Sequence, residues 1–127
     1  MGNWLTASGI SGFLAVALGA FGAHGLQARL ADAADGAKRL SWWQTAAHYQ
    51  LMHALALGLV AFVIAHAPQA RFAGIAFTVG TLLFSGSLYV MALGGPRWLG
   101  AVTPLGGAAF LVGWGFLICC GLTLRRS

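Results

Sequence analysis

The sequence predicts an all-α membrane protein, an antiparallel bundle of four transmembrane helices that forms a single domain over residues 1–127. Hydrophobic residues make up 59% of the chain and charged residues 7%, and the mean hydropathy is +0.81. This composition leaves too little polar surface for a soluble domain. Four apolar stretches also reach the length of about 20 residues that a helix needs to cross a bilayer.

The four predicted spans run from Asn3 to His24, from Thr45 to His66, from Ala70 to Leu93 and from Pro104 to Leu124. A long loop separates the first two, and shorter polar or glycine-rich segments separate the others. Because each span crosses the bilayer in the opposite direction to the one before it, consecutive spans are expected to be antiparallel.

The first two spans have recognisable start and stop signals. Asn3 can cap the first helix, and Gly25 is a typical residue to close it. The stretch "SWWQ" from Ser41 to Gln44 has the spacing of a capping box, which predicts that the second helix begins there. The two tryptophans of that stretch are expected at the level of the lipid headgroups.

The last two spans are also bounded by helix breakers. Pro68 predicts a tight turn between the second and third spans, and "GGP" from Gly94 to Pro96 predicts the end of the third. Thr103 followed by Pro104 reads as an N-cap with proline in the first helical turn, which starts the fourth span.

The first loop carries a helical apolar pattern of its own. Its apolar members fall within about 80° on a helical wheel, and they are Leu26, Leu30, Ala33, Ala37 and Leu40. This pattern predicts a short interfacial helix that lies on the membrane surface. Partial disorder of the loop is the alternative interpretation.

Small residues repeat along the first and fourth spans. In the first span they occupy every fourth position, at Ala7, Ser11, Ala15, Gly19 and Ala23. Gly106, Ala109 and Gly113 can form a similar groove in the fourth. Such strips let helices approach closely in lipid, so we expect tight packing within the bundle. The strip in the first span can equally serve an oligomer.

The charge distribution points to lipid rather than to nucleic acid. The chain has a net charge of +5, but its seven Lys and Arg residues stand singly or in pairs beside the apolar runs, where they anchor helices at headgroups. Three basic residues are predicted on one side of the membrane and four on the other, which leaves the orientation open. The expected partners are the lipid bilayer and either another membrane protein or further copies of the chain.

Several polar side chains interrupt the predicted spans. Antiparallel threading places most of them in one half of the bilayer, on the side of the first loop, and leaves only Thr78 and Thr81 in the other half. On a helical wheel Tyr49, Gln50 and His53 share a sector of about 100°, whereas His48 points elsewhere. A second stripe on the third span holds Thr78, Thr81, Ser85 and Tyr89. The predicted binding residues are His24, Tyr49, Gln50, His53, Ser85 and Tyr89.

Three uses of this polar cluster stay open at this point. The side chains can hydrogen-bond across the bundle only to hold it together, because polar groups exposed to lipid are costly. They can instead form a site for a ligand, ion or substrate, since intramembrane polar clusters often mark function. Catalysis is the third alternative.

The templates for metal binding and for catalysis are incomplete. His24 and His53 alone do not complete a zinc site, although two axial histidines suffice for haem. The only acidic residues, Asp32 and Asp35, lie in the loop, and Ser85 with His53 lacks a third residue to orient the imidazole. The sequence therefore predicts no catalytic residue and no metal site, and it leaves the cofactor undetermined.

Five blocks of the sequence resemble a known family, in order and over nearly the whole chain. They are "GAFGAHGL" at 19–26, "YQLMHALAL" at 49–57, "FSGSLY" at 84–89, "TPLGG" at 103–107 and "GW" at 113–114. Together they resemble the YgdD-like small membrane proteins, domain of unknown function 423. The resemblance implies a four-helix protein of the bacterial inner membrane, or a mitochondrial relative. It implies no activity, cofactor or catalytic residue.

These observations lead to three hypotheses about function. The first is a non-catalytic binding or accessory subunit of an inner-membrane assembly, which the small-residue helix faces favour. The second is a small transporter or channel that uses the polar cluster. The third is a haem- or metal-binding protein, or an intramembrane enzyme. All three place the chain in the cell inner membrane as a multi-pass protein.

Overall fold

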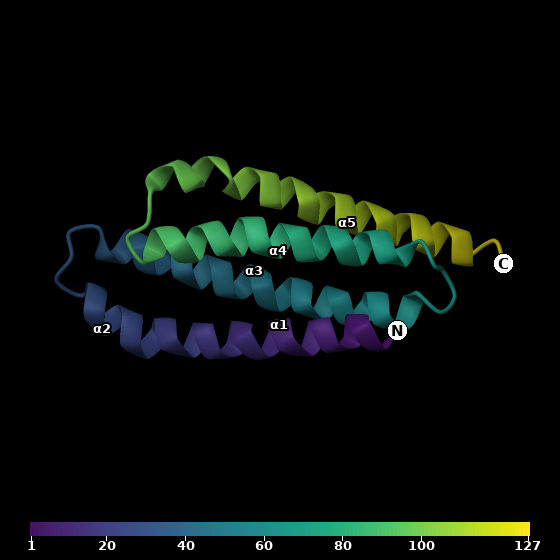
Figure 1. The fold of residues 1–127 in the computed structure, drawn as a ribbon, viewed down its shortest axis with the longest axis horizontal. Helices are drawn as coiled ribbons and strands as arrows, with labels where there is room; N and C mark the ends of the chain where they lie inside the picture. The colour runs from purple at the N-terminus through teal and green to yellow at the C-terminus, as the bar shows by residue number, and fades with distance from the viewer.

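The computed structural model describes all 127 residues and is entirely helical (Figure 1). The first span is built from three consecutive segments, which are α1 (Gly2–Phe21), the short π-helix η1 (Gly22–Leu26) and α2 (Gln27–Leu30). The second and third spans are α3 (Gly36–Val63) and α4 (Ala70–Ala92). The 3₁₀ turn η2 (Arg97–Ala101) then leads into the last helix, α5 (Thr103–Leu124). Four segments are long and apolar enough to cross a membrane, with mean hydropathies of 1.4 to 2.0. The predicted four-span fold is confirmed.

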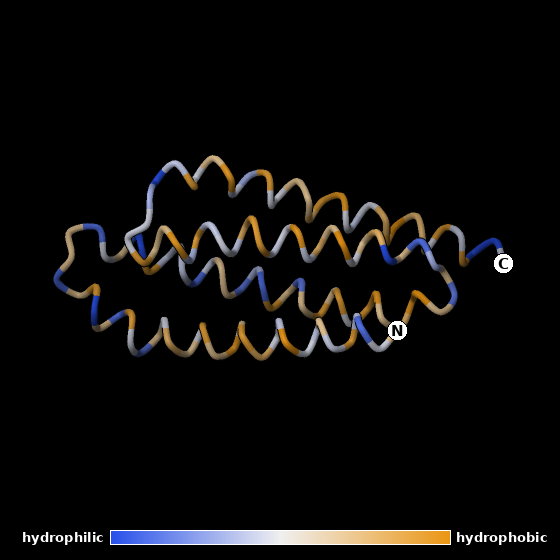
Figure 2. The backbone as a smooth tube through the Cα atoms, viewed as in Figure 1, coloured by the Kyte–Doolittle hydropathy of each residue, from blue (hydrophilic) through white to orange (hydrophobic).

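The helices lie side by side in the order α1, α3, α4, α5 (Figure 1). Each packs mainly against its neighbours in this row, so α3 and α4 form the centre while α1 and α5 lie at the two edges. Both chain termini lie at one end of the molecule. Figure 2 shows apolar residues along all four spans and hydrophilic residues at the loops, with a further hydrophilic stretch in the first half of α3.

The first loop differs from its prediction. The first helix does not end at Gly25 but continues through η1 to Leu30, and α3 begins at Gly36. Leu26 and Leu30 are buried against Trp43 and Ala92, so their apolar side chains cover the ends of α3 and α4. The predicted interfacial helix is therefore wrong, because its apolar face packs within the protein rather than on lipid.

The predicted capping box is also wrong. Because α3 begins at Gly36, the "SWWQ" stretch lies inside the helix, and the Ser41 hydroxyl donates to the Lys38 carbonyl oxygen at 2.7 Å. Asn3 likewise lies inside α1, which begins at Gly2. The predicted ends near Pro68 and at "GGP" are confirmed, and Gly94 has the positive φ of 95° that the turn after α4 requires.

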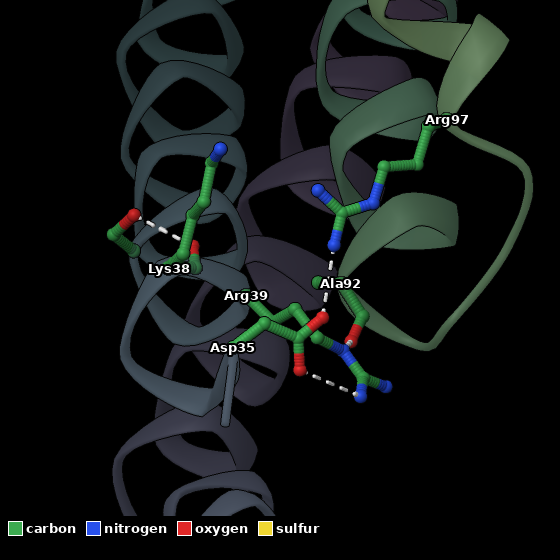
Figure 3. Close-up of polar contacts among 6 residues, drawn as sticks. Asp35, Lys38, Arg39, Ala92 and Arg97 are labelled. Atoms are coloured by element: carbon green, nitrogen blue, oxygen red, sulfur yellow. Dashed lines mark hydrogen bonds and ion pairs between the residues drawn. The ribbon is translucent and has the colours of Figure 1, made fainter. Parts of the chain in front are cut away.

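An ionic cluster closes the loop end of the molecule (Figure 3). The Asp35 carboxylate lies 2.9 Å from the Arg97 guanidinium and 3.7 Å from that of Arg39. The Arg39 Nε–H donates to the Ala92 carbonyl oxygen at 2.9 Å, so a cation stands at the C-terminal end of α4, where it stabilises the helix dipole. The cluster joins the start of α3 to the connection between α4 and α5.

Small residues set the distance between neighbouring helices, as predicted for the fourth span. A Cβ at Gly106 would lie 2.3 Å from the Phe84 backbone nitrogen, and one at Gly113 would lie 2.5 Å from the Phe77 ring. On the first helix Ala15 is buried, and a Cβ at Gly19 would lie 3.9 Å from that of Ala47. These two members of the predicted strip contact α3.

Candidate functional site

A glutamine at the midpoint of α3 joins three helices. Gln50 is 6% exposed, and its side-chain Nε2–H donates to the Ser11 carbonyl oxygen of α1 at 3.2 Å. Its Oε1 accepts a 2.7 Å hydrogen bond from the Tyr89 hydroxyl of α4. Both polar ends of the Gln50 amide are therefore bonded to neighbouring helices.

Other polar side chains make similar bonds between helices. The Ser85 hydroxyl donates to the Ala46 carbonyl oxygen at 2.8 Å, and the Trp43 indole N–H donates to the Leu18 carbonyl oxygen at 2.7 Å. Ser87 and Thr103 share a hydrogen bond of 2.6 Å between α4 and α5. Thr103 makes this contact instead of capping α5, which has no side-chain cap.

The imidazole of His53 lies in an aromatic cluster between α3 and α5. The Trp114 indole N–H can only donate, so the His53 Nε2 at 3.2 Å accepts. The proton then resides on Nδ1, which donates to the Tyr49 carbonyl oxygen at 2.7 Å. The ring stacks on Phe110, with centroids 3.6 Å apart and planes at 7°. His53 is thus a neutral imidazole with both nitrogens bonded.

Four of the six predicted binding residues divide between two places. Gln50 and Tyr89 meet on the α1 side of α3, whereas Tyr49 and His53 lie on the α5 side. The prediction that Tyr49, Gln50 and His53 face one common site is wrong. Because α3 has neighbours on several sides, side chains only 100° apart on its wheel contact different helices. Ser85 is buried and bonds to α3 separately.

His24 belongs to neither place. It is exposed in η1 near the loop end, and the neighbouring Gly22 packs against the Trp43 indole. Trp43 precedes His53 by ten residues, which is about 15 Å along α3. The two histidines therefore do not form the axial pair considered above, and no three His, Cys, Asp or Glu side chains come together elsewhere.

The depth of the polar residues also differs from the prediction. Tyr49 and Gln50 stand at the midpoint of the 28-residue α3, and Thr81 stands near the midpoint of α4. The prediction that Tyr49, Gln50 and His53 lie in the first turns of the second helix is wrong, because α3 begins nine residues earlier than its predicted start at Thr45.

Among the grooves between the helices, three are lined by polar residues of α3 or α4 that bear on function. The central groove, of about 340 Å³, lies among α1, α3 and α4 and includes Thr81, whose buried hydroxyl has no hydrogen-bond partner. The α1–α3 groove, of about 270 Å³, is lined by Ala15, Val16, Gly19, Ala20, Gln44, Ala47, His48 and Leu51. The aromatic groove, of about 630 Å³, is lined by Tyr49, Met52, His53, Phe84, Pro104, Gly107, Ala108, Phe110, Leu111 and Trp114.

Two residues important for these sites escaped the sequence analysis. Trp114 was part of the "GW" block, but its role as donor to His53 depends on how α5 faces α3. Trp43 was expected at headgroup level and is instead 3% exposed. A signal was present for Trp114, since an indole N–H within a predicted span requires an acceptor, whereas Trp43 lies before the predicted start of its span.

Replacing Gln50 by leucine is expected to destabilise the protein by about 1–3 kcal/mol, because the part-buried Tyr89 hydroxyl loses its acceptor. Unfolding of the purified variant in mixed micelles measures the change. The double variant Gln50→Leu with Tyr89→Phe serves as control and should recover part of the loss. An unchanged unfolding midpoint in Gln50→Leu alone would contradict the bridging role.

Comparison with known proteins places the chain in a family. Residues 18–107 match the family described as "Protein of unknown function (DUF423)", which is well over half of the sequence. This chain belongs to that family. The DUF423 match begins within the first helix and includes the predicted binding residues from His24 to Tyr89.

Relatives of this DUF423 protein match over most of their length. The UPF0382 membrane protein YwdK of Bacillus subtilis is 44% identical over 108 residues, which cover 83% of this chain and 84% of YwdK. The UPF0382 inner membrane protein YgdD of Escherichia coli K12 is 41% identical over 120 residues, covering 93% of this chain and 88% of YgdD. No solved structure matches the chain.

The four apolar helices and the relatives agree on what kind of protein this is. This DUF423 member is an integral, multi-pass protein of the inner membrane, embedded in the lipid bilayer.

Proposed function

We propose that this protein is a non-catalytic binding subunit of a larger inner-membrane assembly, which it joins through the α1–α3 groove. The observation that carries the proposal is the exposure of Gln44 and His48, one helical turn apart, on α3, which is long and apolar enough to span a membrane. A polar side chain turned toward lipid costs several kcal/mol. A partner helix that supplies hydrogen bonds to both side chains would remove this cost.

The shape of the α1–α3 groove fits a transmembrane helix. Beside the two polar side chains, the groove is lined by residues with small side chains or none, which are Ala15, Gly19, Ala20 and Ala47. Small residues of this kind let a second backbone approach closely, and polar side chains across such contacts add hydrogen bonds. We therefore expect the occupant to be a single transmembrane helix of another protein, with polar residues one turn apart.

The remaining polar residues favour binding over transport or catalysis. Gln50 and Ser85 are bonded to neighbouring helices, and both nitrogens of His53 have partners. These groups are thus occupied in holding the helices together. The two acidic residues are far from His53 in sequence, in the loop, and Asp35 pairs with Arg39 and Arg97.

Site-specific photocrosslinking in native membranes tests this proposal. A photoreactive residue at Val16, which is 62% exposed in the groove, is expected to yield one discrete adduct with another protein. The same residue at Ile118, which is 65% exposed on α5, serves as the matched control and should yield none. Combining Gln44→Leu with His48→Leu should abolish the Val16 adduct, because the partner loses its hydrogen bonds.

Three results would count against the proposal. They are an adduct of equal yield in the leucine double variant, an adduct that joins two copies of this chain, and a protein that purifies alone in several mild detergents. The double variant should remain folded, since it only replaces exposed polar side chains by apolar ones within a span.

A further inference from the structure

We propose that the aromatic groove binds a lipophilic ring compound that carries a carbonyl oxygen, of the quinone class, with the Tyr49 hydroxyl donating to that oxygen. This site goes beyond the proposed binding subunit and does not depend on it. The groove opens between α3 and α5, whereas the proposed partner surface lies between α1 and α3.

The walls of the groove suit a flat ring. The Tyr49 ring lies 4.5 Å from that of Phe84, and Phe110 stacks on His53 with centroids 3.6 Å apart. Trp114 closes the same wall through its bond to His53. Aromatic pairs favour stacked or edge-to-face arrangements with an incoming ring. The volume of about 630 Å³ falls in the usual range for small-molecule sites.

The Tyr49 hydroxyl is the free polar group of this groove. The hydrogen bonds of the cluster join Trp114 to His53 and His53 to the Tyr49 backbone, and none includes the Tyr49 hydroxyl. The Tyr49 residue is 38% exposed. The hydroxyl of Tyr89, the other tyrosine of the chain, donates to Gln50 and is therefore not free. A phenol is a good donor, so the complementary group on a ligand is an acceptor such as a carbonyl.

The depth of Tyr49 restricts the ligand further. Tyrosines in membrane proteins usually lie at the interface, where water satisfies the hydroxyl. Tyr49 instead stands at the midpoint of α3, far from both ends of a helix that is long and apolar enough to span a membrane, and a hydroxyl without a partner is costly in lipid. Charged lipid headgroups stay at the membrane surface, so the oxygen that reaches Tyr49 must belong to a molecule that is apolar overall. A lipophilic ring carbonyl compound meets this condition.

Space for the ring is present beside Gly107 on α5. A Cβ at Gly107 would meet no atom within 4 Å, although this residue lines the groove. A ligand can therefore lie over the α5 backbone there while its edge faces Tyr49. The same property makes Gly107 a position at which the groove can be filled without disturbing the helices.

Direct binding to the purified full chain in detergent tests the proposal. The probe is radiolabelled 2-methyl-1,4-naphthoquinone, measured by scintillation proximity on immobilised protein, and wild type is expected to bind it saturably. Tyr49→Phe should weaken binding about tenfold, the effect of one lost hydrogen bond. Tyr89→Phe removes the same hydroxyl from the other tyrosine and should leave binding of the probe unchanged.

Two further measurements separate a carbonyl site from a general apolar surface. Excess 2-methylnaphthalene, which has the same ring without the oxygens, should displace the probe poorly. Gly107→Phe should abolish binding while the helical circular dichroism spectrum stays that of wild type. The proposal is overturned if binding is not saturable, if Tyr49→Phe binds as wild type does, or if the hydrocarbon competes as well as unlabelled quinone.

Discussion

Replacing Trp43 by alanine is expected to destabilise the protein by about 3–5 kcal/mol, the usual cost of removing a large buried aromatic side chain. Trp43 is 3% exposed and fills the space over Gly22, where a Cβ would lie 2.4 Å from the indole. Its ring also packs edge-on against Phe21 and Tyr89, at centroid distances of 5.4 and 4.6 Å. The substitution leaves a cavity and removes the indole N–H bond that ties α3 to the Leu18 carbonyl oxygen of α1.

Unfolding of the purified variant in mixed micelles, followed by circular dichroism, measures this loss. Trp98→Ala is the matched control, because Trp98 is 68% exposed and its removal should change stability little. Trp43→Phe should fall between wild type and Trp43→Ala, since it keeps part of the ring but loses the N–H donor. Equal stability of Trp43→Ala and Trp98→Ala would show that the indole does not hold the first helix against α3.

Replacing Gly106 by alanine is the second substitution with a large expected effect, about 3 kcal/mol or loss of the folded protein from the membrane. A Cβ at Gly106 would lie 2.3 Å from the Phe84 nitrogen and 2.7 Å from its Cα. These are backbone atoms of α4, which cannot turn aside as a side chain can. The two helices must separate, and the contacts of Phe110 with Gly80 would be lost with them.

The neighbouring Gly107 provides the control for this prediction. A Cβ there meets nothing within 4 Å, so Gly107→Ala should be neutral or slightly stabilising, because alanine favours a helix more than glycine does. Both variants change one glycine to alanine in the same turn of α5, so any difference between them reports helix contact rather than helix propensity. Indistinguishable unfolding midpoints would contradict the close approach of α4 and α5.

The division of polar residues shows where sequence reasoning reached its limit. The wheel correctly separated His48 from His53, and antiparallel threading correctly brought Tyr89 near Gln50. It did not separate Gln50 from His53, because α3 has neighbours on several sides. A wheel describes directions from one axis, and it does not say which helix lies in each direction.

The first loop shows a second limit. Its apolar periodicity was read correctly, but a pattern of this kind only states that one face is apolar. Such an apolar face can be covered either by lipid or by other apolar side chains of the protein. In the structure Leu26 and Leu30 bury it against Trp43 and Ala92, which turns the predicted surface helix into an extension of the first span.

The sequence by itself determined the number of spans, their antiparallel order and the turns at Pro68 and Gly94, because apolar length and helix breakers act locally along the chain. Only the tertiary structure decided which polar side chains meet. Helices α1 and α5 are apolar around most of their circumference, so their own patterns do not specify which face turns inward. That choice follows from close packing between helices, such as Gly106 on Phe84 and Gly22 on Trp43.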